Sequence, residues 1–133
     1  MQRITTVFLV VVGIIHLLPL PGVLGASRLT ALYGLDLSQP DLLILMRHRA
    51  VLFGLLGAFL IYAAFNASLH RLALIAGLVS VISFIVLAML VGGYNAAVHR
   101  VVVADAVALA LLLAGAVLHF VGSQPSDQAS LPG

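Results

Sequence analysis

Four long apolar stretches occupy most of this 133-residue chain and constrain its fold more than any other feature. They cover residues 4–24, 42–65, 72–91 and 101–121. A helix needs about 20 apolar residues, at ~1.5 Å rise per residue, to cross a hydrocarbon core about 30 Å thick. Each stretch is long enough for this, or nearly so. The sequence therefore predicts an all-α fold, a bundle of four transmembrane helices.

The composition agrees with a membrane protein and excludes several other classes. The chain is 63% hydrophobic and 8% charged, whereas a soluble domain is about 45–50% apolar and about 25% charged. Because there is no cysteine, a disulfide, an iron–sulfur cluster and a thiol nucleophile are excluded. The positive charges are arginines scattered at helix ends, so they do not form a nucleic-acid-binding face. We interpret four of them as interfacial anchors at the lipid headgroups: Arg28, Arg49, Arg71 and Arg100.

The first loop carries a short amphipathic segment over residues 27–34. Its apolar side chains recur at helical spacing on one face, and Arg28 lies on another. This pattern predicts a short interfacial helix lying flat at the headgroup level. Ser27 is expected to cap its start and Gly34 to end it.

The rest of the chain predicts one membrane domain and a polar tail. The domain is expected to span residues 1–121, and the Pro- and Gly-containing residues 122–133 are expected to be disordered. Arg3 followed by an apolar run also imitates a signal peptide. His16 argues against cleavage, because a discarded segment has no use for an imidazole in its apolar run.

Charged side chains inside the apolar stretches need partners, since an intramembrane carboxylate costs about 2.5–3.5 kcal/mol even on lenient insertion scales. With helices alternating in direction, Asp105 and the triplet Arg47, His48 and Arg49 lie at matching depth, ~24 Å from the face where the chain begins. Arg47 continues a stripe of small residues on its helix, and such stripes mark close helix contacts. We predict that Arg47 faces the bundle and pairs with Asp105, and that Arg49 extends toward the headgroups.

These polar residues are predicted to form one cluster open to the opposite membrane face. Three interpretations stay open: an ion pair that fixes helix register, a small polar pocket for a lipid, quinone or other amphiphile, and a proton or ion relay. The predicted cluster consists of His16, Arg47, His48, Asp105, Tyr94 and Asn95.

No catalytic residue, metal site or cofactor is predicted. Haem b would need two histidines on facing helices at compatible height, but His16 and His48 differ by about 7 Å in estimated depth. His70 and His119 lie near the opposite face. Copper or zinc has no cysteine, methionine cluster or i, i+4 histidine pair to bind it.

Several features in order along the chain resemble a known group of proteins. They are the Pro- and Gly-rich residues 19–25, the amphipathic residues 27–34, Arg47 ahead of a glycine stripe, and the polar turn at residues 92–95. This order resembles small four-helix bacterial inner-membrane proteins of the DoxX-like kind. The resemblance implies the same four-helix fold, and it implies a link to redox or quinone-associated partners in some members.

Two longer runs are similar to a narrower set of short proteobacterial membrane proteins. The runs are LLILMRHRAVLFGLLG and LVGGYNAAVHRVVVADAVAL. Some of those proteins carry the label phosphopantetheine adenylyltransferase. The phosphate-binding motif of that soluble enzyme, Thr/His-x-Gly-His, is absent from this sequence, and so is any strand pattern.

Two classes of function follow. The first is a non-enzymatic small-ligand-binding or accessory subunit, packed in the lipid bilayer against a larger membrane partner or a second copy, with a quinone or lipid-like ligand. The second is a membrane redox module or enzyme that uses His16, His48 and Asp105. We expect a multi-pass protein of the bacterial inner membrane with both termini on the same side, in the cytoplasm.

Overall fold

The computed structural model describes residues 1–123, and this part of the chain is entirely helical apart from its connecting loops. Four segments are long and apolar enough to cross a membrane: Gln2–Leu24, Pro40–Ala64, Ala67–Val91 and Ala96–Gly122. The predicted all-α, four-span architecture with a short helix in the first loop is confirmed. The elements are α1 (Gln2–Leu17), η1 (Leu20–Leu24), α2 (Ala26–Tyr33), α3 (Pro40–Ala64), η2 (Ala67–Leu69), α4 (His70–Val91) and α5 (Ala96–Gly122).

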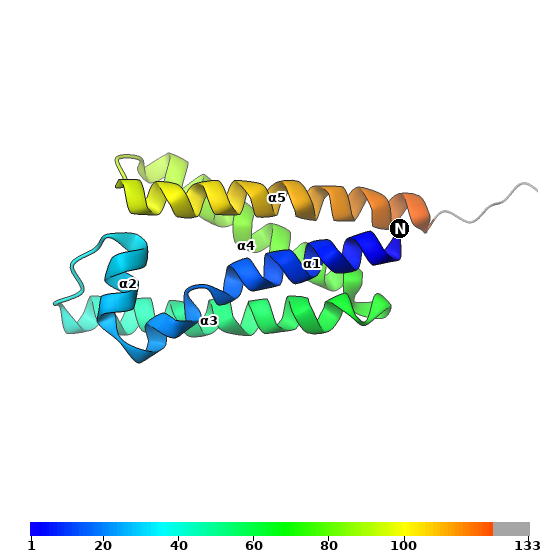
Figure 1. Ribbon diagram of the computed structural model, residues 1–133. Coiled ribbons are helices and arrows are strands. Elements are labelled where there is room, and N and C mark those ends of the chain that lie inside the picture. Colours follow the sequence, from blue (N-terminus) through cyan, green and yellow to red (C-terminus); the bar gives the residue numbers. More distant parts are fainter. Residues whose placement is uncertain (124–133) are drawn as a thin grey trace, which may run out of the picture.

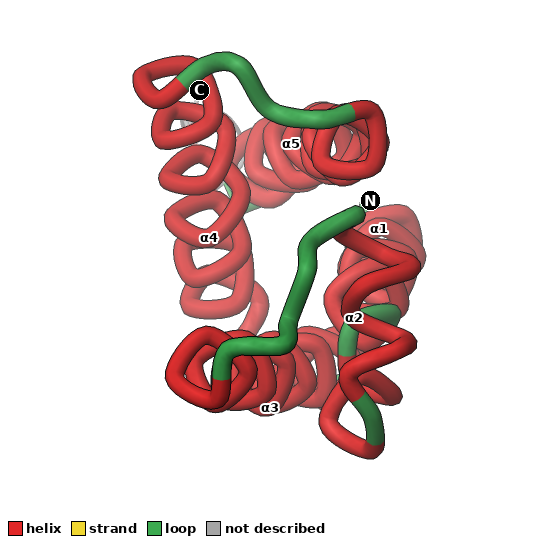
Figure 2. Tube along the Cα trace, turned by 90° about the vertical axis from the view of Figure 1, so that its left-hand side faces the viewer, coloured by secondary structure: helices red, strands yellow, loops and turns green. Residues whose placement is uncertain are grey.

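The four long helices stand at the corners of one bundle (Figures 1 and 2). Helix α1 packs against α3 and α5, and α4 packs against α3 and α5. Helices α3 and α5 therefore occupy opposite corners. Gly122 lies beside Met1, so the beginning of the chain and the end of α5 are at the same end of the bundle. Most of the predicted tail, from residue 124 on, lies outside the described residues.

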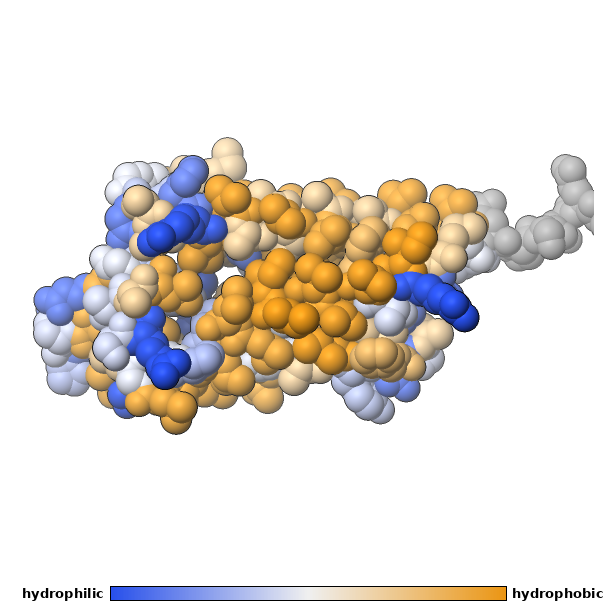
Figure 3. All heavy atoms as spheres, viewed as in Figure 1, coloured by the Kyte–Doolittle hydropathy of each residue, from blue (hydrophilic) through white to orange (hydrophobic). Residues whose placement is uncertain are grey.

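The bundle has a small apolar core and a large apolar outer surface. Leu9, Leu60 and Leu112 are fully buried among the four helices. In contrast, Val79 on α4 and Val117 on α5 are each more than half exposed. An extensive exposed apolar surface of this kind marks contact with a membrane or with another protein. On the face seen in Figure 3, apolar side chains cover the middle of the molecule.

Helices α1 and α3 approach each other backbone to backbone. A Cβ atom on Gly57 would lie 2.7 Å from the carbonyl oxygen of Gly13, and one on Gly13 would lie 2.9 Å from the carbonyl oxygen of Gly57. Only residues without a side chain permit this distance. The contact is the close packing that small residues make in membranes.

Proline and glycine set the ends of the first elements. Helix α1 ends at Leu17, two residues before Pro19, and the chain continues as the short 3-10 helix η1. The predicted cap at Ser27 is wrong, because α2 already begins at Ala26 with Gly25 at the N-cap position and no side-chain cap. Gly34 ends α2 as predicted, in the left-handed conformation at φ 64° that glycine adopts without strain.

Helix α2 packs on the bundle with its apolar face. Leu29 and Tyr33 are buried together with Leu37 and Ala50, the last of which belongs to α3. The apolar face predicted to lie on the headgroups is therefore covered by protein. This packing places α2 across one end of the bundle, beside η1 and the start of α5 (Figure 1).

Candidate functional site

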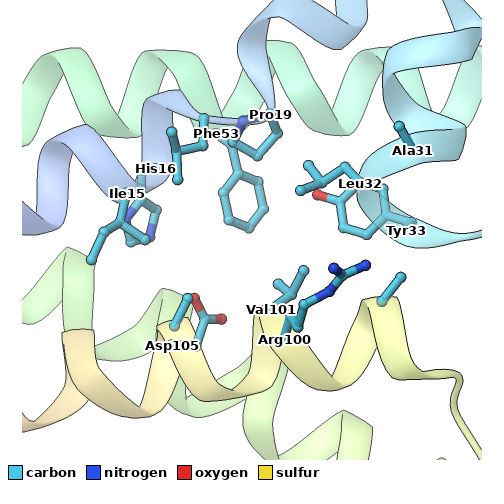
Figure 4. A pocket seen from close by; sticks show the side chains of 13 residues that line it. Ile15, His16, Pro19, Ala31, Leu32, Tyr33, Phe53, Arg100, Val101 and Asp105 are labelled. Carbon is cyan, nitrogen blue, oxygen red and sulfur yellow. The ribbon is translucent and has the colours of Figure 1, made fainter.

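A cavity of about 370 Å³ lies between the end of α1, helix α2 and the first turns of α5. Phe53 of α3 forms its inner wall, and Asp105 points into it from α5 (Figure 4). Most of the lining is apolar, which is usual for a small-molecule site. The lining residues are Ile15, His16, Leu18, Pro19, Ala31, Leu32, Tyr33, Phe53, Ala97, Arg100, Val101, Ala104 and Asp105.

The cavity continues into a shallower groove on the outside of the bundle. Two residues of the turn after α1 and two of α2 line both spaces: Leu18, Pro19, Ala31 and Leu32. The groove runs from there to Arg28. In Figure 3 the face of the molecule is hollowed between the polar end and the apolar middle. The cavity therefore opens toward the side of the bundle.

His16 lies at the inner end of the cavity, but its ring nitrogens already have protein partners. Nδ1 donates to the Val12 carbonyl oxygen at 2.9 Å, since a carbonyl can only accept. In the neutral ring Nε2 then accepts from the Ser80 hydroxyl at 3.2 Å. The ring also stacks on Phe53, with centroids 5.4 Å apart. His16 thus connects α1, α3 and α4.

Asp105 is the exceptional polar residue of the site. Its side chain is only 4% exposed, and within residues 1–123 it makes no hydrogen bond and no ion pair. A buried carboxylate normally has such a partner, because the unpaired group is expensive in a low-dielectric environment. Its oxygens face the cavity (Figure 4), so a molecule in the cavity could supply the missing bond.

The predicted ion pair between Arg47 and Asp105 is wrong. No arginine of residues 1–123 forms a salt bridge with Asp105, and the Arg47 Nε atom is buried without a hydrogen-bond partner. The reason is the arrangement of the helices. The small-residue stripe that Arg47 continues faces α1 and η1, where Gly54 lies against Leu20 and Gly57 against Gly13. Helix α5 stands at the opposite corner of the bundle.

Arg49, predicted to extend toward the headgroups, instead lies half-buried under aromatic rings. Its guanidinium carbon is 4.7 Å from the ring centroid of Phe53, 5.1 Å from that of Tyr33 and 5.2 Å from that of Phe84. Such contacts stabilise a desolvated arginine without a carboxylate. The positive charge that acts on Asp105 is that of Arg49, across space and without an ion pair.

Tyr33 joins this aromatic group from α2. Burial raises the pKa of its hydroxyl above the ordinary value, and the nearby positive charge of Arg49 partly offsets this effect. The hydroxyl is therefore a neutral donor and acceptor at physiological pH. Tyr33 and Arg100 both line the cavity (Figure 4).

The structure brings together only part of the predicted cluster. His16 and Asp105 line the cavity, whereas Arg47, His48, Tyr94 and Asn95 do not. His48 is exposed, and Tyr94 stacks on His99 with centroids 6.2 Å apart.

Asn95 holds the site together from outside the cavity. Its amide donates to the carbonyl oxygens of Tyr33 at 2.9 Å and Gly34 at 3.2 Å. Its Oδ1 accepts from the Val98 amide at 2.8 Å and so caps α5. A single side chain thereby ties the end of α2 to the start of α5.

The other predicted anchors and histidines lie elsewhere. Arg28, Arg71 and Arg100 are exposed. His70 and His119 face each other at the end where the chain begins, with ring centroids 6.2 Å apart. In the described part of the chain no group of three or more His, Cys, Asp or Glu residues could hold a metal ion.

Sequence reasoning missed three contributors to the cavity: Tyr33, Phe53 and the pocket-lining role of Arg100. Tyr33 did share a helical face with Leu29, which indicated burial but not against what. Phe53 lies one turn after Arg49, a spacing at which side chains on a helix meet. That spacing could have indicated that Arg49 packs on an aromatic ring.

The fold and this cavity define a small four-pass membrane protein. No family model, curated protein or solved structure matches the chain.

Proposed function

We propose that this protein binds a small amphiphile in the lateral cavity between α1, α2 and α5, as a non-enzymatic ligand-binding or accessory protein of the membrane. The observation that carries the proposal is Asp105, a buried carboxylate that faces an apolar cavity and has no partner among residues 1–123. Keeping such a group in a membrane costs free energy, so its presence favours a role in recognition.

The shape of the site supports an amphiphile as the ligand. The mouth lies beside Leu18, which is 63% exposed at the outer surface. An apolar tail can therefore stay in the bilayer while the polar end reaches the hydroxyl of Tyr33 and the carboxylate of Asp105. A lipid and a quinone both have this form.

A redox module or enzyme that uses His16, His48 and Asp105 has less support. Both ring nitrogens of His16 already form hydrogen bonds, with Val12 and Ser80. His48 is exposed and does not line the cavity. A general base would need a free nitrogen within hydrogen-bond reach of the substrate.

We also propose that the protein is DoxX-like and resides in a bacterial inner membrane with its N-terminus in the cytoplasm. The support is the resemblance of residues 19–34, Arg47 and residues 92–95 to that group. As an accessory subunit it would use the exposed apolar side of α4, which buries little within the bundle, against a larger partner or a second copy.

Labelling with a photoreactive long-chain alcohol tests the binding. The protein is reconstituted in lipid nanodiscs with an alcohol that carries a diazirine close to its hydroxyl, a group that can donate to Asp105. We expect saturable labelling of residues at the mouth, such as Leu18 and Leu32. Labelling of the lipid-facing Val107 should rise linearly with concentration.

Two alanines on α5 provide a matched pair of variants. Ala104 lines the cavity, whereas Ala106 is exposed on the outside of the same helix. Ala104→Leu should remove the saturable labelling, and Ala106→Leu should leave it unchanged. Labelling that is unsaturable at every position, or that both variants leave intact, would refute the proposal.

A further inference from the structure

The charges around the cavity are separated in a regular order. Arg28 lies at the outer end of the groove and Arg100 at the mouth of the cavity. Asp105 lies further in, five residues beyond Arg100 on α5 and so about 7.5 Å along the helix axis. A ligand that spans the site thus meets positive charge outside and a carboxylate inside.

Arginine at the mouth favours a phosphate. The planar guanidinium matches phosphate oxygens in two parallel hydrogen bonds. Arg28 and Arg100 are both exposed, and neither forms a salt bridge within residues 1–123. The apolar surface between them includes Leu18 and Leu32, against which the first carbons of an acyl chain can lie.

The carboxylate inside requires a hydrogen-bond donor. Within the described chain Asp105 receives no hydrogen bond, while the ring nitrogens of its cavity neighbour His16 bond to Val12 and Ser80. A neutral hydroxyl and an ammonium can both donate to a carboxylate. A terminus without any N–H or O–H group leaves the carboxylate unpaired.

We infer that the cavity recognises a phosphodiester headgroup whose far end carries a hydrogen-bond donor, with the phosphate at Arg100 and the donor on Asp105. This inference rests on the proposed function, since it names the chemical class of the amphiphile. The headgroup belongs either to a membrane phospholipid or to a free phosphodiester, and the two sources are separable by experiment.

Native mass spectrometry of delipidated protein in detergent tests the donor. Phosphatidylethanolamine and phosphatidylcholine with the same acyl chains have the same charge, but only the first carries N–H donors. A hydrogen bond to a charged group contributes enough for about a tenfold or greater difference in affinity. We expect phosphatidylethanolamine to bind about tenfold more tightly, or better, and phosphatidylglycerol, with its hydroxyls, to resemble it.

Variants separate the effect of the hydrogen-bond donor on affinity from the effect of headgroup size. Asp105→Leu should remove the preference over phosphatidylcholine, which a purely steric preference would survive. Arg100→Gln should weaken all three lipids, while Arg71→Gln, at an exposed position of α4 outside the groove, should weaken none. Equal binding of phosphatidylcholine to the unaltered protein, or a preference that persists in Asp105→Leu, would overturn the inference.

Deacylated glycerophosphoethanolamine identifies the source. If it competes with the lipid, the headgroup alone is recognised and a soluble phosphodiester is the source. If it does not compete, the acyl chains are needed and the source is the membrane. Both results support recognition of the headgroup by Arg100 and Asp105, and they differ only in its source. If the photoreactive alcohol still labels the mouth saturably while the lipid preference is absent, the proposed function stands and only this inference fails.

Discussion

Replacing Asp105 with alanine is expected to stabilise the bundle. The carboxylate is buried, has no partner within residues 1–123, and borders an existing cavity. An acidic residue at the centre of a span costs about 2.5–3.5 kcal/mol. Asp105 lies about 13.5 Å along α5 from its first residue, which is short of the helix centre, so its cost is below the full value. The positive charge of Arg49 offsets a further part of the free-energy cost of burying the carboxylate. We therefore expect a gain of about 1–3 kcal/mol.

The sign of the change distinguishes this structure from an ion-paired one. Breaking a buried ion pair by removing one partner costs about 3–5 kcal/mol, so a true Arg47–Asp105 pair would make the variant much less stable. A large void penalty is not expected, because the removed atoms border space that is already open.

Equilibrium unfolding in mixed micelles measures the effect. The chain has no cysteine, so two introduced cysteines on α1 and α5 can carry fluorophores whose separation reports the folded bundle. Asp41→Ala is the control, since Asp41 is exposed in the first turn of α3. It should lose about 0.3–1 kcal/mol of favourable helix-dipole energy. A loss of stability in Asp105→Ala that exceeds this control would refute the reasoning.

Three further predictions concern the packing around the site. Gly57→Ala should destabilise the bundle by about 1–3 kcal/mol in the same unfolding assay, because the new Cβ would meet the backbone of Gly13. Gly77→Ala should destabilise it less, because the new Cβ would meet only the side chain of Leu112, at 3.0 Å. Ser80→Ala should lower stability by about 0.5–1.5 kcal/mol through the lost bond to His16, and a double variant with His16→Phe should show less than the sum of the single losses. The raised pKa of Tyr33 means that its folded form keeps its proton to higher pH than the unfolded form. The stability it contributes is complete below the ordinary pKa of about 10 and is lost as pH rises through the folded value, so an ultraviolet titration of Tyr33→Phe should lack the last part of the phenolate signal.

The sequence predicted the spans because hydropathy alone sets them, and residues 92–95 and Gly34 predicted their breaks correctly. It also placed His16 and Asp105 inside the bundle, since a polar residue in an apolar run is expensive in lipid. These predictions depend only on the residues within one segment and not on which segments pack together.

The partner of each buried charge depends on which helices are adjacent, and that is where the prediction failed. Depth along the membrane matched Arg47 to Asp105, but their helices stand at opposite corners of the bundle. Small residues showed that α3 has a close neighbour without showing that the neighbour is α1. The aromatic surroundings of Arg49 involve three different helices, a combination that no single-segment pattern predicts.

Site-directed spin labelling along α5 can show whether this chain spans a bilayer with Asp105 turned toward the cavity. Single cysteines at positions 103 to 108 would carry nitroxides in liposomes, and their collisions with dissolved oxygen would be measured. The account predicts high oxygen accessibility at positions 103, 106 and 107 and minima at 105 and 108, following the observed burial. A maximum at position 105, or accessibility to a water-soluble relaxation agent at every position, would contradict it.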